Sequence, residues 1–325
     1  MSLDAAIATF IRSGEGDREA LAVAAFAHQL ATNPTLAAMF GAAHPSRLAD
    51  IPAVPVSLFK ELDLGPQPPL PSDALFRTSG TTGQVRGVHR TRSTRLYDLG
   101  AVLHANARVT HRPGRVVSLC PAEPDSSLGH MLRLFGTVEQ CFSDGTVHAD
   151  TWKRITDVSR TEPIFLAATA FALDALLAMP GNACLDERSV VMVTGGFKGR
   201  TTRLDPPGLY RALAARLGSP RVFGEYGMTE LSSQLWTDPV FAGEVPGAFI
   251  APPWLAVYAV HPQTGAPVNG EGLLRFVDLA NLGSVLAIET QDLGRVEHDP
   301  GGDRVTLLGR LEGAELRGCS LRVNG

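Results

Sequence analysis

Residues 76–90, FRTSGTTGQVRGVHR, combine hydroxyl side chains, glycines and basic side chains in one short stretch. Hydroxyl groups can donate hydrogen bonds to an anion, and glycines let successive backbone N–H groups turn toward it. Arg86 adds a permanent positive charge. The stretch suits phosphate binding, although an ordinary polar turn between two strands would use the same residue types. The residues concerned are Thr78, Ser79, Gly80, Thr81, Thr82, Gly83 and Arg86.

This stretch does not match the loop of P-loop nucleotide hydrolases. That loop requires the pattern G-x-x-x-x-G-K-[ST], and the segment from Gly80 to Gly87 has no Lys-Ser or Lys-Thr pair at its end. The sequence therefore argues against a P-loop NTPase, and the phosphate compound has to be inferred from other residues.

Other segments downstream carry charged, hydroxyl and aromatic side chains at close spacing. They are GEYGMTEL at 224–231, ETQDLGRV at 289–296 and LLGRLEGAELRG at 307–318. Taken singly, YGMTE could begin a helix and DLGR could be a turn. Their occurrence in this order, after the phosphate-binding stretch, argues against coincidence.

Together these segments resemble the signature motifs of the ANL superfamily of adenylating enzymes. This superfamily includes acyl-CoA synthetases, the adenylation domains of non-ribosomal peptide synthetases and firefly luciferase. Its phosphate-binding motif is T-S-G-T-T-G-x-x-[KR]-G, usually with Pro-Lys where this chain has Val85-Arg86, so the positive charge is kept. Gln291 stands where the family motif T-G-D-L-G-R has its first glycine. The resemblance extends over about residues 50–320.

The resemblance implies ATP and Mg²⁺ as cofactors. By this resemblance, the loop from Ser79 to Gly83 would hold the β- and γ-phosphates. Thr229 would contact the α-phosphate, Glu230 would help to bind Mg²⁺, and Tyr226, followed by Gly227, would stack on adenine. The implied reaction is attack by a carboxylate on the α-phosphorus of ATP, with release of pyrophosphate. A thiol then takes the acyl group from the acyl adenylate.

The same resemblance assigns the ribose and the glycine segment. Asp292 would hold the ribose hydroxyls, and Arg310 would be a second ribose contact. Gly195 and Gly196 resemble the glycine segment that lines the adenine and acyl sites. Lys198, close behind them, could supply a cation near the nucleotide or be an exposed surface lysine.

One branch of the superfamily is closer still. IPAVPVSLFKELDL, TGGFKGR and GRLEGAELRGCSL resemble the acyl-protein synthetase family, the LuxE-type fatty-acid-activating subunits of bacterial bioluminescence reductase complexes. In that family a cysteine near the C-terminus accepts the acyl group before a reductase does. Cys319 matches that position, and it lies between Arg317 and Arg322, which favour a thiolate. A fatty acid and an acyl-reductase or carrier-protein partner are implied.

The residues leave other functions open. A CoA-ligase-like enzyme for aryl or acyl groups, or a stand-alone adenylating enzyme of a biosynthetic pathway, would use another acceptor, and Cys319 could be a small buried side chain. A non-catalytic acyl- or nucleotide-binding subunit is a further alternative. Retention of Ser79, Thr229, Glu230 and Asp292 argues against it. His130, in SSLGHMLRLF, could line an acyl pocket or simply be packed.

The composition excludes several classes of protein. The 325 residues carry a net charge of −4, so there is no basic surplus of the kind that marks nucleic-acid or membrane-surface binding. The cysteines are scattered without a C-x-x-C pair, which indicates neither a zinc site nor a disulfide framework. The N-terminus lacks the basic segment of a secretory signal. We expect a cytoplasmic protein that binds small molecules or another protein.

The order of elements predicts an α/β fold of the ANL type, with parallel strands, covering helices and a small antiparallel β subdomain. Residues 1–48 have helical spacing, Ser57 could cap a short helix, and 65–73 form a proline-rich connector. GRVVSLCPA and SVVMVTGGF predict buried parallel strands. Residues 164–179 predict a helix that covers them.

The expected division of the chain follows these patterns. It consists of an N-terminal helical layer at 1–75, an adenylate-forming α/β core at 76–253, a β subdomain at 254–310 and a hinge remnant with a C-terminal tail at 311–325.

Overall fold

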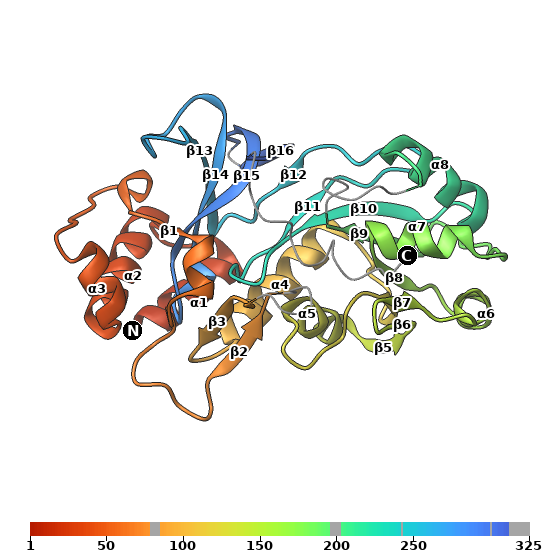
Figure 1. Ribbon diagram of the computed structural model, residues 1–325, viewed down its shortest axis with the longest axis horizontal. Coiled ribbons are helices and arrows are strands. Elements are labelled where there is room, and N and C mark those ends of the chain that lie inside the picture. The colour runs from red at the N-terminus through yellow and green to blue at the C-terminus, as the bar shows by residue number, and fades with distance from the viewer. Residues whose placement is uncertain (79–84, 196–202, 242, 300, 312–325) are drawn as a thin grey trace.

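The computed structural model describes residues 1–78, 85–195, 203–241, 243–299 and 301–311. The N-terminal residues form helices, as the sequence predicts: α1 (Leu3–Ser13), α2 (Arg18–Thr32) and α3 (Pro34–Phe40). Ser2, Asp17 and Asn33 cap them by accepting hydrogen bonds from backbone N–H groups of the first turns. These helices lie at one end of the molecule, beside the antiparallel strands (Figure 1).

The central structure is one large sheet of 12 strands, and five neighbouring strands form its parallel part. Its parallel strands lie in the order β5-β4-β8-β9-β10. Nearly all residues of β4, β8, β9 and β10 are buried, because helices cover both faces, whereas the edge strand β5 has no buried residue. The bounds are β4 (Arg115–Leu119), β5 (Thr137–Gln140), β8 (Phe165–Thr169), β9 (Val190–Thr194) and β10 (Arg221–Tyr226).

The two faces of the parallel part pack against different helices. On one face α4 (Arg95–Arg108) and α5 (Ser127–Phe135) contribute Ala101, Met131 and Phe135 to a cluster with strand residues such as Phe165. Phe135 and Phe165 stack edge to face, with ring centroids 5.6 Å apart. The other face packs against α6 (Thr151–Ser159), α7 (Ala170–Ala178) and α8 (Pro206–Leu217).

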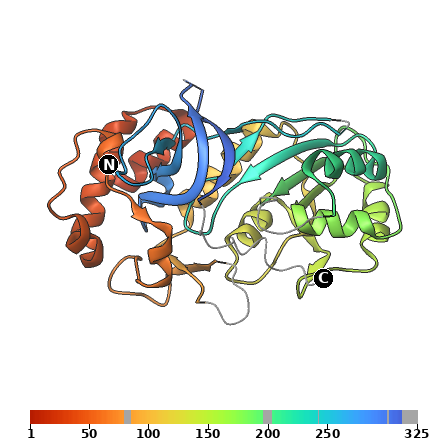
Figure 2. The ribbon, with the colours of Figure 1, turned by 45° about the horizontal axis from the view of Figure 1, so that its top comes forward.

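The antiparallel strands continue the same sheet. From β10 the order runs β11-β12-β16-β15-β14-β13, and short β1 pairs with β15. These strands pack against α1 and α2 through Trp254, Val277 and Ala287, and they lie beside the N-terminal helices in both views (Figure 1, Figure 2). The bounds are β1 (Val54–Pro55), β11 (Leu235–Thr237), β12 (Phe249–Ile250), β13 (Leu255–Val260), β14 (Gly270–Asp278), β15 (Ala287–Glu297) and β16 (Arg304–Arg310).

Short elements complete the fold. The hairpin of β2 (Ala74–Arg77) and β3 (Val88–Thr91) forms a separate sheet, as does the pair β6 (Phe142–Ser143) and β7 (Thr146–Val147). The 3-10 helices are η1 (Leu48–Asp50), η2 (Val56–Lys60) and η3 (Leu279–Asn281). No helix in the described ranges is long and apolar enough to cross a bilayer.

The predicted α/β fold class is confirmed, and two local predictions are wrong. Residues 165–169 are strand β8 rather than the start of a helix, which begins only at Ala170. A short apolar run fits a buried strand and a buried helix equally well, so its spacing could not decide. Ser57 lies inside η2, whose first turn has no side-chain cap. The division into an α/β core and a β subdomain stays a prediction, and one sheet runs through both parts.

Candidate functional site

A pocket opens where the parallel strands β9 and β10 end. It encloses about 630 Å³ of empty space, including open solvent at its mouth. In open α/β sheets, ligands bind outside the carboxyl ends of the strands, so this position favours a binding site. The pocket is lined by Arg77, Arg86, Tyr97, Pro121, Glu123, Ser126, Ser127, Leu128, Met131, Thr194, Glu225, Gly227, Met228, Thr229 and Gln234.

The hairpin β2–β3 brings Arg77 and Arg86, from the stretch that the sequence predicts to bind phosphate, to this pocket. Thr78 follows β2, and its Oγ1 accepts a hydrogen bond of 2.8 Å from the N–H of Gly87. Arg86 donates to the carbonyl oxygen of Thr78 at 2.5 Å and pairs with Asp125 at 3.2 Å. Arg77 reaches the same carboxylate at 3.3 Å. Both arginines line the pocket.

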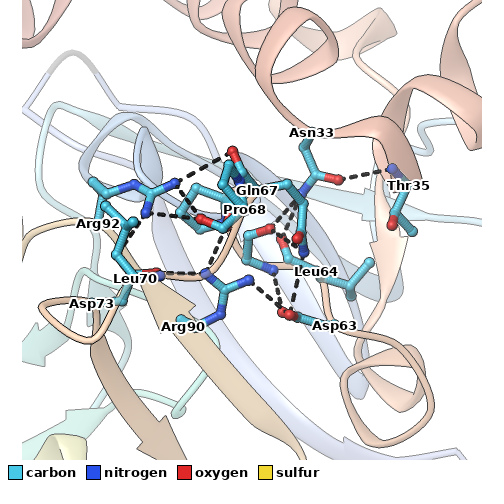
Figure 3. Close-up of polar contacts among 12 residues, drawn as sticks. Asn33, Thr35, Asp63, Leu64, Gln67, Pro68, Leu70, Asp73, Arg90 and Arg92 are labelled. Carbon is cyan, nitrogen blue, oxygen red and sulfur yellow. Dashed lines mark hydrogen bonds and ion pairs between the residues drawn. The ribbon is translucent and has the colours of Figure 1, made fainter.

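Ion pairs among Asp63, Asp73, Arg90 and Arg92 form a polar cluster that joins strand β3 of the hairpin to the chain before β2 (Figure 3). Arg90, on β3, donates to Asp73 at 2.6 Å and to Asp63 at 2.7 Å. Arg92 donates to the other oxygen of Asp73 at 2.9 Å. The side chain of Asp73 is 1% exposed and that of Arg90 is 8% exposed. The proline-rich connector is thereby joined to the hairpin that precedes the site.

The segment 224–231 leaves β10 and passes the pocket. Gly227 and Thr229 line the pocket, and the buried Glu230 follows them. The backbone of this turn is held from two sides. The carbonyl oxygen of Thr229 lies 2.6 Å from Nδ1 of His89, and that of Glu230 accepts a hydrogen bond of 2.9 Å from Asn281.

Asp292 contacts both Tyr226, at the end of β10, and Arg310, although the three residues are far apart in sequence. The hydroxyl of Tyr226 donates to Oδ2 of Asp292 at 2.7 Å, and Nε of Arg310 lies 3.0 Å from Oδ1. Asp292 and Arg310 face each other on β15 and β16, because they are partners in the antiparallel register. The ring of Tyr226 packs against Phe249 and Phe276.

Gln291 takes part in the same arrangement. Its Oε1 accepts a hydrogen bond of 3.1 Å from Arg310, and its carbonyl oxygen accepts one of 2.9 Å from the N–H of Leu311. The residue that departs from the family motif therefore helps to position the arginine.

The remaining predicted site residues are distributed as follows. Gly195 directly follows β9 and has a φ of 77°, a left-handed conformation that favours glycine. His130 lies on α5, 2.6 Å from Asp98, and its ring packs 5.4 Å from that of Tyr97. Tyr97 lines the pocket, whereas His130 is not among its lining residues. Ser79, Gly80, Thr81, Thr82, Gly83, Gly196, Lys198 and Cys319 lie outside the described residues.

Several residues that line the pocket belong to no motif that is visible in the sequence. They include Tyr97, Thr194 and Gln234. Glu225 had a usable signal, since it precedes Tyr226 on a strand, and successive side chains of a strand point to opposite faces. If Tyr226 faces the nucleotide residues, Glu225 faces the other side. Tyr97 and Gln234 could be found only from tertiary structure.

The donor set fits the Mg²⁺ that the resemblance implies. Mg²⁺ in nucleotide sites is usually held by one or two carboxylates together with substrate phosphates and water. Within the described ranges no group of three or more His, Cys, Asp or Glu side chains could hold a metal ion. Glu123 and Glu225 line the pocket and Glu230 follows the pocket residue Thr229 in sequence, so carboxylates that could accompany a nucleotide-bound Mg²⁺ are present.

Comparison with known proteins identifies the fold as that of the large N-terminal domain of ANL-type enzymes. A 2-hydroxyisobutyryl-CoA ligase, solved with 2-HIB-AMP and CoA, has a TM-score of 0.56 and 15% identity, over 83% of this chain and 66% of that one. An anthranilate-CoA ligase, solved with anthranoyl-AMP, has a TM-score of 0.51 and 15% identity, over 73% and 46%.

A further solved structure is O-succinylbenzoate-CoA synthetase from Bacillus subtilis with ATP and magnesium. Its TM-score is 0.49 at 19% identity, over 74% of this chain and 52% of that one. This chain thus spans about half the length of several of these ligases. No family model and no curated protein matches the sequence.

Proposed function

We propose that this protein activates a carboxylic acid with ATP, forming an acyl adenylate and releasing pyrophosphate. One observation carries the proposal: a single turn of chain at the end of β10 joins the predicted nucleotide residues to the pocket. Tyr226 bonds to Asp292 on one side of this turn, and Gly227 and Thr229 line the pocket on the other. An acid in the pocket would therefore lie next to a nucleotide bound at Asp292.

The chemistry needs two anions to approach each other. A carboxylate oxygen forms a bond to the α-phosphorus, and the bond to the pyrophosphate oxygen breaks. Positioning and charge neutralisation matter more here than proton transfer. Arg86 would face the phosphates, Thr229 would donate to the α-phosphate, and Asp292 with Arg310 would hold the ribose. Mg²⁺ bound with the help of Glu230 would neutralise phosphate charge.

The acyl adenylate would then pass its acyl group to a thiol. Cys319 is the acceptor that the acyl-protein synthetase resemblance implies, with a fatty acid as substrate and an acyl reductase or carrier protein as partner. CoA is the alternative acceptor. The similarity to a ligase solved with both an acyl adenylate and CoA supports the alternative.

Carboxylate-dependent exchange of labelled pyrophosphate into ATP tests the first half-reaction. We expect exchange with at least one acid from a panel of fatty, aryl and amino-bearing acids, and its loss in Thr229→Ala and Asp292→Ala. Binding of ATP without exchange for any acid would instead support a non-catalytic nucleotide-binding subunit.

A second experiment separates the thiol acceptors. A hydroxylamine-labile mass increase on the Cys319 peptide, absent in Cys319→Ser, would establish self-acylation. Full formation of an acyl-CoA by Cys319→Ser would establish CoA as the acceptor and leave the cysteine without a catalytic role.

A further inference from the structure

A buried side chain holds the main chain of the segment that passes the pocket. Asn281, at the end of η3, is 1% exposed, and its Nδ2 donates to the carbonyl oxygens of Glu230 and Val285, both at 2.9 Å. Its Oδ1 accepts a hydrogen bond from the hydroxyl of Ser232. A carbonyl oxygen can only accept, so Nδ2 has to face the two carbonyls and the amide has a single orientation. The main chain of Glu230 is therefore held by one side chain of η3.

Asp278 strengthens the connection between η3 and this segment. It precedes η3, and its Oδ1 accepts from the N–H of Ala280 at 2.9 Å and from the hydroxyl of Ser233 at 2.8 Å. Its Oδ2 accepts from the N–H of Ser232 at 3.1 Å. All four residues are buried, so water does not replace a hydrogen bond that is lost there. Displacement of the segment relative to η3 would leave buried polar groups unpaired, which is costly.

Gln29 connects this network to the N-terminal helices. It lies on α2, which packs against the antiparallel strands beside it (Figure 1). Its Nε2 donates to the carbonyl oxygens of Asn281 at 2.9 Å and Leu282 at 3.1 Å, and its Oε1 accepts from the N–H of Leu286 at 2.9 Å. Gln29 is buried as well. A continuous chain of hydrogen bonds thus runs from α2 through Asn281 to the main chain of Glu230.

We propose that Asn281 is a positioning residue for adenylation, which holds the main chain of Thr229 and Glu230 where these residues meet the α-phosphate and Mg²⁺. The inference rests on the proposed function and adds to it a residue outside the motifs. Asn281 is not among the residues that line the described pocket, so it acts through the backbone of Glu230. Gln29 supports Asn281 from α2, which gives the N-terminal helices a part in the site.

Asn281→Leu tests the inference, because leucine keeps the branched shape of the side chain and has no donor. The measurement is pyrophosphate exchange with an acid from the panel that supports it. We expect kcat to fall about tenfold and the Mg²⁺ concentration for half-maximal exchange to rise about tenfold, because groups that orient a metal ligand typically contribute this much. KM for the acid should not change.

Calorimetric binding of ATP gives a second readout that does not require turnover. The Kd for ATP is measured with a chelator and with excess Mg²⁺, and the ratio of the two values reports how much the metal tightens binding. We expect Asn281→Leu to lower this ratio about tenfold and to leave the Kd measured with the chelator close to that of the wild type. A loss of stability alone would not change the ratio.

Asn33→Leu is the matched control. Asn33 is 3% exposed, and its Nδ2 also donates to two carbonyl oxygens, those of Leu64 at 2.9 Å and Gly65 at 3.0 Å. This variant should lose stability in urea to a similar extent and keep the wild-type Mg²⁺ requirement and binding ratio.

Ser232→Ala replaces Asn281→Leu if the latter does not fold. It removes only the hydroxyl that bonds to Oδ1 of Asn281. The Mg²⁺ requirement should rise and the binding ratio should fall, each by a smaller factor than is expected for Asn281→Leu. Wild-type values of both in Ser232→Ala would overturn the inference.

The outcomes separate this inference from the proposed function. If Asn281→Leu keeps the wild-type Mg²⁺ requirement and binding ratio, or if Asn33→Leu changes them equally, the inference is overturned and the adenylation stands. If no acid supports exchange in the wild type, adenylation fails, and the binding ratio decides the inference. A ratio that falls only in Asn281→Leu supports it. A ratio that does not fall, or that is already one in the wild type, overturns it.

Discussion

His89, on strand β3 of the hairpin β2–β3, holds the backbone of the pocket residue Thr229. Its Nδ1 lies 2.6 Å from the carbonyl oxygen of Thr229. A carbonyl can only accept, so Nδ1 carries the proton. Burial lowers the pKa of His89 to about 4, and the ring is therefore neutral near pH 7. The contact joins the hairpin β2–β3 to the segment 224–231.

Removal of this contact should slow adenylation. His89→Leu fills the space without a donor, and we expect kcat for pyrophosphate exchange to fall about tenfold, equivalent to about 1.4 kcal/mol. In His89→Asn the amide nitrogen can take the place of Nδ1, so activity should return toward the wild-type value. Equal loss in both variants, with unchanged melting temperatures, would mean that the hydrogen bond does not position Thr229.

The contact between Tyr226 and Asp292 predicts a coupling to the ribose. Asp292→Asn weakens the acceptor that Tyr226 and Arg310 hold in place. We expect KM for ATP to rise about tenfold, and a similar rise when wild-type protein uses 2′-deoxy-ATP. If Asp292 binds that hydroxyl, the two changes together should cost little more than either alone. Full additivity in steady-state kinetics would place the ribose elsewhere.

The residues proposed to bind the nucleotide can be selected from the sequence, because they lie in short contiguous motifs, and their role stays a prediction. Tyr226, Asp292 and Arg310 belong to separate motifs. Asp292 and Arg310 lie side by side only because β15 and β16 pair in this antiparallel register. The sheet was predictable where turns separate alternating strands, as between β13 and β14.

The other residues that line the pocket could not be predicted in the same way. Tyr97 lies on a helix, Gln234 follows a loop, and neither belongs to a spacing pattern that indicates chemistry. Their approach to Glu225 depends on how α4 packs across the sheet. The strand at 165–169 could not be predicted from the sequence for a related reason. FLAAT has no alternation of apolar and polar residues, and its strand conformation depends on pairing with β4 and β9.

Buried His104 predicts a loss of stability in acid. It lies on α4 with Nε2 3.1 Å from the carbonyl oxygen of Ile250, and burial lowers its pKa to about 4 from 6.5. Between these values the unfolded chain binds the proton and the folded chain does not, so stability falls as pH falls from 6.5 toward 4. From pH 7 to pH 5 this histidine should contribute a loss of about 2 kcal/mol.

Urea unfolding of wild type and His104→Gln at both pH values measures this contribution. The glutamine amide can keep the hydrogen bond to Ile250 but does not titrate, so the loss between pH 7 and pH 5 should be smaller by about 2 kcal/mol. Contributions from His89, of the same sign, and from Asp278, whose pKa burial raises to about 6, cancel in the comparison. Identical pH dependence of the two proteins would contradict the assignment.

The cluster in Figure 3 predicts a large stability cost for a change remote from the pocket. Asp73 accepts hydrogen bonds from Arg90, Arg92 and the N–H of Leu70 at 2.6, 2.9 and 3.0 Å. Breaking a buried pair leaves a charge without its partner, which typically costs about 3–5 kcal/mol. We therefore expect Asp73→Asn to lower the free energy of unfolding by about 3 kcal/mol.

Asp50→Asn is the matched control for this change. Asp50 pairs with Arg47 at 2.9 Å, but both side chains are largely exposed, at 42% and 68%. Solvent screens such a pair, so the control should shift the urea midpoint far less than Asp73→Asn. Because the cluster anchors β3, Asp73→Asn should also raise KM for ATP, whereas the control should not. Equal shifts in the two variants would show that the cluster does not hold the hairpin.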